Sequence, residues 1–274
     1  MQLQGMNLHS FKDMSNLRDI LTVIMPVRLD SKERMDNLKA VLQHISCLDC
    51  RVIVLEADKT PVLKEQMWMK EEFMRFIEYR FKPDDAPIFH RTKYINQLLS
   101  EATTEIVAVW DADILVSYRQ IKEAVVLINQ GCTIAYPYNG EYVMLSDIES
   151  NSARRRFDTE CLKNRKLPSV FGRPFCGGVF LVHRQRYIKC GGENEHFTGW
   201  GPEDAERLRR VSILGYVVKW TKEGQAYHLY HPRGKNSNFY TDKDAIRLRM
   251  ELVKVCSMDK EELQNYITEK TWKQ

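Results

Sequence analysis

The chain has 274 residues, of which 43% are hydrophobic and 28% charged, so it can form one main globular domain and has no signature of disorder. A net charge of +4 from 41 basic and 37 acidic residues argues against a nucleic-acid partner and suits an anionic small molecule. The longest apolar stretches fall short of the roughly 18 residues of a membrane span, and no secretory signal is recognisable. Seven scattered cysteines favour reduced thiols over disulfides. We therefore expect a soluble cytoplasmic protein with no integral membrane segment, and at most a peripheral contact with the inner face of the membrane.

Apolar, strand-like runs alternate with helical periodicity in the first part of the chain. In chain order we predict strand 21–27, helix 31–45, strand 51–55, helix 64–80, helix 93–102 and strand 105–110. The strand runs are short and continuously apolar, as in strands buried on both faces, whereas the helices carry apolar residues on one face. This alternation implies an α/β fold with a mainly parallel sheet covered by helices on both sides.

The second part of the chain contains less regular elements. We predict helix 117–129, strand 133–136, a polar segment 154–166, strand 178–183, helix 205–214, strand 216–220 and helices 242–255 and 259–267. Asp242 and Asp259 are the expected N-caps of the last two helices. We expect one main domain over residues 20–235 and a C-terminal helical extension, residues 236–274, packed on it.

Asp111 and Asp113 come directly after the third predicted strand, at the sheet edge where ligands bind in such folds. Their spacing allows both carboxylates to face the same side. One can bind a divalent cation while the other reaches it through water or contacts a ribose, and a nucleotide diphosphate supplies further oxygen ligands. The cation would also neutralise charge on a departing diphosphate. An aspartate that caps the next helix is the alternative, but the position after a buried strand favours a metal site.

The segment 197–206 places two glycines, a tryptophan and three acids around the start of a predicted helix. The glycines allow the backbone to bring Trp200 beside a ligand, and stacking on an aromatic ring is a recurrent way to hold a sugar. Glu203 or Asp204 could then act as a general base toward an acceptor hydroxyl. Acids at a helix start also complement its dipole, but this explanation gives no reason for Gly-Trp-Gly.

Two of the seven histidines, His228 and His231, lie within one short segment after the last predicted strand. Residues at i and i+3 can approach one ion, although histidines are more often packed or solvent-facing residues. We predict that both bind the metal together with Asp113 and Asp111. Because imidazole suits Mn²⁺ better than Mg²⁺, Mn²⁺ is the predicted cofactor and Mg²⁺ the alternative.

The segment Gly199 to Asp204 resembles the Gly-Trp-Gly-x-Glu-Asp motif of the β-1,4-galactosyltransferase family and of related bacterial GT-A enzymes, including chondroitin-polymerase-like and family 2 transferases. The stretch Phe175 to Val179 is similar to the family's Gly-Gly-Val segment beside the donor sugar. The aspartate pair matches the family's own pair, and Pro26 to Arg28 matches its Pro-x-Arg near the nucleotide. The order and approximate spacing of all four motifs are kept across residues 21 to 235.

This resemblance implies the GT-A fold and an inverting displacement in which Asp204 is the catalytic base and Glu203 helps to bind the acceptor sugar. A Met-x-x-His segment completes metal coordination in the family, so His231 falls on the family's histidine and His228 replaces its methionine. The animal enzymes carry an anchor and disulfides, which this chain does not show, so we expect a bacterial-type relative. The resulting sugar-binding and acceptor-binding set is Gly177, Gly178, Trp200, Gly201 and Glu203.

Two further positions could contact a nucleotide. GT-A enzymes commonly carry an acid after the second strand that recognises uracil or ribose, and Glu56 and Asp58 occupy that place. Arg91 could contact a nucleotide or belong to a solvated face. The predicted nucleotide-binding set is Pro26, Val27, Arg28, Glu56, Asp58, Arg91 and Asp111.

The leading hypothesis is an inverting transfer of a hexose or N-acetylhexosamine, of the Gal, GalNAc or Glc type, from a UDP-sugar to a hydroxyl of a saccharide acceptor. A nucleotidyltransferase would also use an α/β sheet with an acid-bound metal, but it usually has a glycine-rich basic loop after the first strand, and residues 25–30 contain no glycine. A non-catalytic carbohydrate-binding protein that uses Trp200 would leave the aspartates and histidines unexplained.

Overall fold

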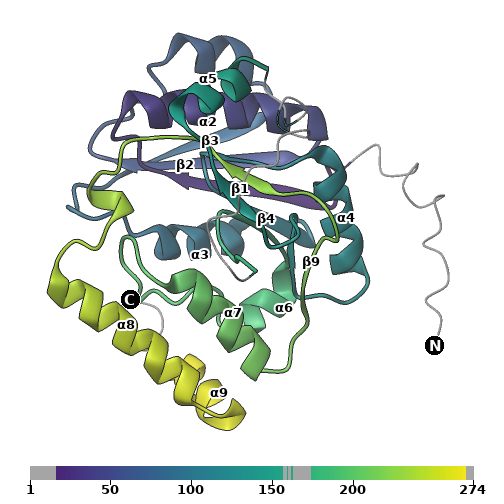
Figure 1. Cartoon of the computed structure of the whole chain (residues 1–274), viewed down its shortest axis with the longest axis vertical. Coiled ribbons are helices and arrows are strands. Elements are labelled where there is room, and N and C mark those ends of the chain that lie inside the picture. Colours follow the sequence, from purple (N-terminus) through teal and green to yellow (C-terminus); the bar gives the residue numbers. More distant parts are fainter. Residues whose placement is uncertain (1–16, 157–158, 160–161, 163–173, 270–274) are drawn as a thin grey trace.

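A seven-stranded sheet forms the centre of the protein in a computed structural model, which describes residues 17–156, 159, 162 and 174–269 (Figure 1). The strand order is β3-β2-β1-β4-β8-β6-β9. Strand β8 is antiparallel to both of its neighbours, and the other pairs are parallel. The strands are β1 Leu21–Val27, β2 Arg51–Asp58, β3 Ile77–Pro83, β4 Ile106–Trp110, β6 Ile134–Tyr136, β8 Val179–His183 and β9 Val218–Trp220.

Helices cover both faces of this sheet (Figure 1). Helices α2 and α5 lie on one side, and α3, α6 and α7 lie on the other. The helices are α2 Lys32–Ile45, α3 Arg91–Glu101, α4 Tyr118–Asn129, α5 Asp147–Arg156, α6 Arg184–Lys189, α7 Glu203–Ile213, α8 Asp242–Ser257 and α9 Lys260–Thr268, with 3₁₀ turns η1 Ser46–Leu48 and η3 Lys235–Ser237. The α/β architecture with a mostly parallel sheet is therefore confirmed.

The central strands are buried along their whole length, which explains their uninterrupted apolar sequences. Every residue of β1 and of β4 is buried, as expected for strands with helices on both faces. Strand β1 is followed by Ser31, whose side chain accepts a hydrogen bond from Arg34 N and caps α2. The chain therefore turns sharply at the carboxyl end of β1 and leaves that edge of the sheet open for a ligand.

A second, three-stranded sheet lies next to the carboxyl end of β4. It consists of β5 Ile114–Leu115, β10 Ala226–His228 and β7 Tyr142–Met144, in the order β5-β10-β7. His228 pairs with Ile114, and Leu229 N donates to the carbonyl oxygen of Asp113 at 2.8 Å. This small sheet joins the segment after β4 to a segment more than a hundred residues later in the chain.

Several predicted elements differ from the structure. The helix expected at 64–80 is wrong: one π-helical turn, η2 Met69–Phe73, precedes β3. Strand β3 is an edge strand with mostly half-buried residues, so its sequence lacks the continuous apolar run of the inner strands. Thr241, rather than Asp242, caps α8, whereas the predicted cap Asp259 forms a capping box. The predicted polar segment 154–166 lies largely outside the described residues.

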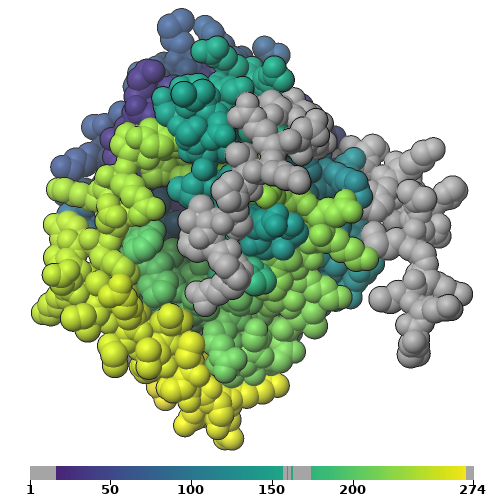
Figure 2. Space-filling view, viewed as in Figure 1, coloured from purple at the N-terminus to yellow at the C-terminus, as the bar shows by residue number. Residues whose placement is uncertain are grey.

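Helices α8 and α9 pack against α7 and border one side of the face shown in Figure 2. Leu248, Val255 and Leu263 are buried in this contact. Packing of a C-terminal extension on the main domain was expected, while the boundary at residue 235 stays a prediction. None of the helices described is long and apolar enough to cross a membrane.

Candidate active site

A cleft of about 260 Å³ opens at the carboxyl ends of β1 and β4. Its walls come from the ends of both strands, from the small sheet, from the start of α7 and from the segment around η3. Charged and aromatic side chains predominate among its lining residues, which include Arg28, Arg34, Phe89, Arg91, Asp111, Asp113, Tyr142, Phe175, Trp200, Glu203, Asp204, His228, His231, Arg233 and Ser237. The cleft therefore lies where the parallel sheet was expected to bind its ligand.

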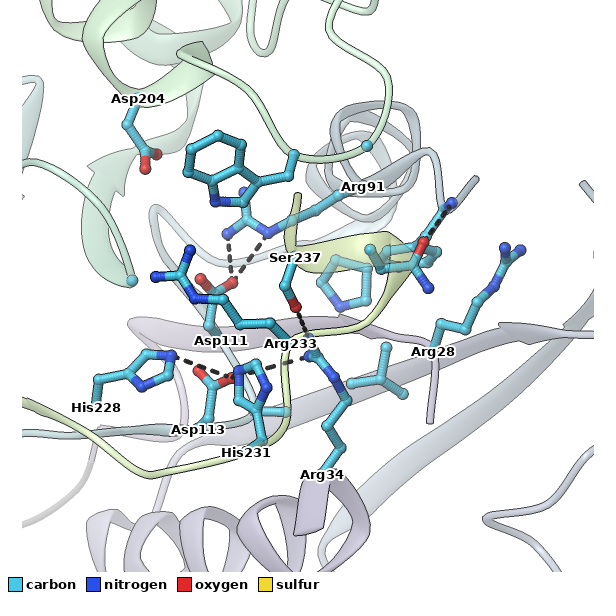
Figure 3. Close-up of a pocket in the computed structure, with 18 of the residues that line it drawn as sticks. Arg28, Arg34, Arg91, Asp111, Asp113, Asp204, His228, His231, Arg233 and Ser237 are labelled. Carbon is cyan, nitrogen blue, oxygen red and sulfur yellow. Dashed lines mark hydrogen bonds and ion pairs between the residues drawn. The ribbon is translucent and has the colours of Figure 1, made fainter. Parts of the chain in front are cut away.

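Asp113, His228 and His231 point toward one another in this cleft (Figure 3). One ligand atom from each lies within 4.8 Å of the others. The Nε2 atoms of His231 and His228 lie 3.2 and 3.7 Å from Asp113 Oδ2. A carboxylate oxygen and two imidazole nitrogens form a donor set that suits Mn²⁺ and other divalent transition metals.

The hydrogen bonds around these histidines fit a metal site. His231 Nδ1 lies 2.9 Å from the carbonyl oxygen of Pro232, and a neutral imidazole that donates this bond presents the lone pair of Nε2 to Asp113. A hydrogen bond from the other ring nitrogen to a carbonyl oxygen is common for metal-binding histidines. His228 Nδ1 is buried and has no hydrogen-bond partner in the described part of the chain. A cation between Asp113 and the two rings would stabilise this arrangement of acceptors.

The electrostatics keep Asp113 and His228 in the protonation states that bind metal. Burial alone would raise the pKa of Asp113, but His228, His231 and Arg34 outweigh burial and hold the pKa well below its usual range. Burial lowers the pKa of His228, with further lowering from His231 and Arg34, although Asp113 opposes the shift. The carboxylate is therefore ionised and the imidazole neutral at neutral pH.

Asp111 has a different environment from Asp113. Its Oδ1 accepts from Arg91 Nε at 2.9 Å and from Arg91 Nη2 at 2.5 Å. Burial raises the pKa of Asp111 to about 6, Asp113 and Asp204 add to the shift, and Arg91 opposes it. Asp111 lies outside the three-residue ligand cluster, so its predicted contact with the metal or a ribose stays a prediction.

Asp204 is held in place by an arginine in the next turn of α7. Its Oδ1 accepts from Arg207 Nη1 at 2.6 Å. Arg207 also donates from Nε and Nη2 to Glu193 at 2.8 and 2.9 Å, and it lies over the ring of Phe180. Because Arg207 and Glu193 are fully buried, this network fixes the orientation of the Asp204 carboxylate in the cleft.

The glycines before β8 make room for this carboxylate. A Cβ at Gly177 would lie 2.3 Å from Asp204 Oδ2, so a side chain at that position would push the carboxylate aside. Gly178 has φ +82° and a Cβ there would meet Ile114 at 3.1 Å, so the left-handed backbone and the contact both require glycine. The Gly-Gly pair thus lets Asp204 approach the backbone closely.

Glu203 and Trp200 lie on the same side of the cleft as Asp204. Glu203 Oε2 is buried without a hydrogen-bond partner among the described residues, and burial, with the charge of Asp204 adding, raises its pKa to about 8. Trp200 is 45% exposed and contacts Phe239 edge-on at 4.8 Å. An exposed indole beside carboxyl groups is a suitable surface for a sugar ring.

Comparisons with known proteins agree with this architecture. Residues 163–232 match the family described as the N-terminal domain of galactosyltransferase. The β-1,4-galactosyltransferase 7 proteins of mouse and human are 30% identical over 74 residues, 27% of this chain and 19% of each relative. The matching segment therefore spans about a fifth of these relatives, both of them animal proteins, and the expected bacterial-type relative stays a prediction.

Solved structures extend the likeness to most of the chain. GalNAc-T7 with UDP, GalNAc and Mn²⁺ superimposes with a TM-score of 0.60 at 13% identity, over 90% of this chain and 49% of that one. A mannosyltransferase from Pyrobaculum calidifontis with GDP-Man and Mn²⁺ has a TM-score of 0.52 at 16% identity, over 79% of this chain and 59% of that one. The chain has the GT-A fold.

Two of the predicted nucleotide contacts, Glu56 and Asp58, are not among the residues that line the cleft. Glu56 is fully buried, and its two oxygens accept from Leu63 N at 2.9 Å and from the Tyr79 hydroxyl at 2.5 Å. Burial raises its pKa despite these bonds. Asp58 accepts from the backbone of Lys59, and neither acid lines the cleft. Both stabilise the local structure around the end of β2, and their contact with a nucleotide stays a prediction.

The predicted residue Arg28 lines the cleft, but its guanidinium is already occupied. It donates to the carbonyl oxygens of Ala57 and Ala86 and to the Asp84 carboxylate at distances of 2.6 to 2.9 Å. Tyr94 donates to the same Asp84 oxygen. Arg28 therefore orders the loop after β3 at the cleft wall.

Some lining residues were not identified from the sequence. Arg34 lies in the first turn of α2, where a basic residue gives no signal of a site, and Ser237 belongs to a short 3₁₀ turn. Phe89 lies two residues before Arg91 but belongs to no recognised motif. Tyr142 is separated from the recognised motifs by many residues, and its place in the cleft becomes visible only in the folded chain.

Proposed function

We propose that this protein is a metal-dependent, inverting glycosyltransferase that moves a hexose or N-acetylhexosamine from a UDP-sugar to a hydroxyl of a saccharide acceptor. The observation that carries the proposal is that a metal-type cluster, Asp113 with His228 and His231, and an oriented carboxylate, Asp204, line one cleft. The GT-A fold, the partial match to galactosyltransferases, and the neighbour that holds UDP, GalNAc and Mn²⁺ support it.

Asp113, His228 and His231 would hold the divalent cation, for which we propose Mn²⁺. The ion would supply Lewis-acid stabilisation of the negative charge on the leaving diphosphate. In the chain itself, the basic side chains of Arg34, Arg91 and Arg233 line the cleft and offer the charge that a nucleotide diphosphate needs.

Asp204 would accept the proton of the attacking acceptor hydroxyl. Its carboxylate lines the cleft. Arg207 orients Oδ1, and Oδ2 lies against Gly177. General bases act through such fixed geometry. Glu203, with its pKa raised to about 8 by burial, is largely protonated at neutral pH and can donate a hydrogen bond to an acceptor oxygen.

The arrangement of these groups within the cleft supports an inverting transfer. The cluster around Asp113 comes from β4 and the small sheet, whereas Asp204 comes from the start of α7. A sugar placed between them would be attacked from the Asp204 side while its diphosphate leaves toward the Asp113 side. A single displacement of this geometry inverts the anomeric carbon.

Isothermal titration tests the proposal directly. The protein is expected to bind UDP in the presence of Mn²⁺ and to bind it much more weakly in EDTA. Asp113→Ala should abolish the metal-dependent part, with Asp36→Ala, an exposed acid of α2, as the control that keeps it. Equal UDP affinity with and without Mn²⁺ would contradict the proposal that a metal ion in this cleft helps to bind UDP.

The donor sugar is tested by screening. A panel of UDP-sugars incubated with Mn²⁺ should give UDP release from one hexose or N-acetylhexosamine donor well above the others. GDP-mannose belongs in the panel because the structural neighbour from Pyrobaculum calidifontis holds that donor. Preference for GDP-mannose would contradict the UDP assignment while leaving the transferase assignment intact.

A further inference from the structure

Arg34 extends from the first turn of α2 into the cleft and reaches the candidate metal cluster (Figure 3). Its Nη2 donates to Ser237 Oγ at 2.6 Å, and its Nε lies 3.0 Å from Asp30 Oδ1. Its Nη1 lies 4.0 Å from Asp113 Oδ2, the same oxygen that faces His228 and His231. The Arg34 side chain is 19% exposed, so solvent screens its charge only in part.

The cleft is close to neutral without a metal. Its lining residues include four arginines, of which Arg28 is paired with Asp84, and three carboxylates, Asp111, Asp113 and Asp204, beside the largely protonated Glu203. A divalent cation at Asp113 adds two positive charges beside Arg34. Like charges at such distances repel strongly where water is partly excluded, and a diphosphate carries the charge that compensates both.

We propose that Arg34 couples metal binding to diphosphate binding. Without nucleotide, its charge competes with the cation for Asp113 and weakens metal binding. With a nucleoside diphosphate present, the guanidinium donates to phosphate oxygens, a pairing for which its planar group of donors is well suited. This inference rests on the proposed function, because it requires a metal and a nucleoside diphosphate to share the cleft.

The coupling gives Arg34 effects of opposite sign on the two ligands. Arg34→Gln removes the charge and should bind Mn²⁺ alone more tightly than the wild type does. The same variant should bind UDP more weakly in saturating Mn²⁺. Mn²⁺ and UDP each raise the affinity for the other by the same factor, because coupling between two sites is reciprocal. This factor, typically about five-fold or more, should be smaller in Arg34→Gln than in the wild type. A purely structural role would weaken both ligands together.

Substitution of Ser237 distinguishes the effect of the Arg34 charge from that of the hydrogen bond between Arg34 and Ser237. Ser237→Ala loses the contact with Arg34 but keeps the guanidinium, so its affinity for Mn²⁺ alone should stay within about two-fold of the wild type, well below typical coupling factors. Arg34→Lys keeps the charge and should retain most of the repulsion. Thermal unfolding of each variant shows whether the fold is preserved before binding is compared.

The experiment measures free Mn²⁺ by electron paramagnetic resonance and titrates UDP and UMP calorimetrically with the full chain. The expected result for Arg34→Gln is tighter Mn²⁺ binding without nucleotide, weaker UDP binding with Mn²⁺, and a smaller change for UMP. Weaker binding of both Mn²⁺ and UDP, or a Ser237→Ala variant that reproduces the Arg34→Gln changes, would overturn the coupling. A wild-type protein that binds UDP independently of Mn²⁺ would instead overturn the proposed function.

Discussion

Arg207 Nη1 donates to Asp204 Oδ1 at 2.6 Å, three residues away along α7, while the rest of its guanidinium is bound to buried Glu193. The Tyr187 hydroxyl also donates to Glu193, at 2.6 Å. A carboxylate at a helix start would otherwise swing between the first-turn amides and solvent. The buried arginine instead fixes Oδ1, while Oδ2 lies against Gly177.

Arg207→Lys is expected to lower turnover by about ten-fold or more, because one ammonium group cannot serve Asp204 and both oxygens of Glu193. UDP binding with Mn²⁺ should change little, since these residues do not touch the Asp113 cluster. Turnover is measured as UDP release from the accepted donor, and Arg209→Lys, an exposed position of the same helix, is the matched control. Equal losses in turnover and in UDP affinity would indicate general disruption instead of misplacement of Asp204.

Gly177→Ala tests the close approach on the other side of Asp204. A Cβ at this position would lie 2.3 Å from Asp204 Oδ2, so the carboxylate must move. A displacement of about 1 Å in a reacting group can cost roughly 100-fold in rate. UDP release should fall by at least ten-fold while metal-dependent UDP binding persists, and full turnover would show that the position of this oxygen is not critical.

The sequence predicted most of the central sheet but not how the site residues meet. Apolar runs such as 21–27 and 105–110 are typical of strands buried on both faces, and their short length and β-branched residues favour a strand over a buried helix segment. Strand β3 lies at the sheet edge and mixes polar with apolar residues, and its sequence was therefore mistaken for part of a helix. Whether a strand lies at the edge of a sheet depends on tertiary structure, and local sequence periodicity does not predict it.

The sequence pointed to site residues that belong to a motif, but not to those that reach the site only through tertiary contacts. Asp113 and His231 were identified from their spacing and from the resemblance to galactosyltransferases. Their meeting depends on β5 and β10, strands of two and three residues that are too short to show any period. Glu56 illustrates the reverse case, since an acid after a strand was assigned to a ligand, whereas the fold buries it against Tyr79.

Glu203 makes the stability of the protein depend on pH. Burial raises its pKa from 4.5 to about 8, so in the folded protein it stays protonated at pH values where the unfolded chain ionises. Its contribution to stability is therefore present below pH 4.5 and is lost as the pH rises through about 8. Glu203→Gln should raise the melting temperature at pH 9 by roughly 3 °C or more and change it little at pH 4.

The measurement is thermal unfolding of both proteins across this pH range in the presence of EDTA, so that no metal contributes. Glu261→Gln, an exposed acid of α9, is the control expected to show the wild-type pH profile. A wild-type and a Glu203→Gln protein with parallel profiles would mean that Glu203 ionises normally. The hydrogen-bond donor role proposed for Glu203 would then be lost as well.

The C-terminal helix α8 holds the loop that carries Trp200. Arg247 donates to His196 O and to Thr198 Oγ1, both at 2.9 Å, and Leu248 packs against Gly201. Arg247→Ala removes two anchors of the segment 194–201, so we expect its amides to exchange faster with solvent. Acceptor-dependent transfer should fall while UDP binding with Mn²⁺ is retained.

Hydrogen exchange followed by mass spectrometry measures the first effect peptide by peptide. Lys243→Ala, an exposed position in the first turn of the same helix, is the control for loss of a basic side chain. Faster exchange in 194–201 alone would show that α8 holds the loop that carries Trp200 in place. An increase spread over all of α7 and α9 would mean that Arg247 stabilises the whole helical layer. Unchanged exchange would mean that other contacts, such as that of Asn194 with Glu251, hold the loop without Arg247.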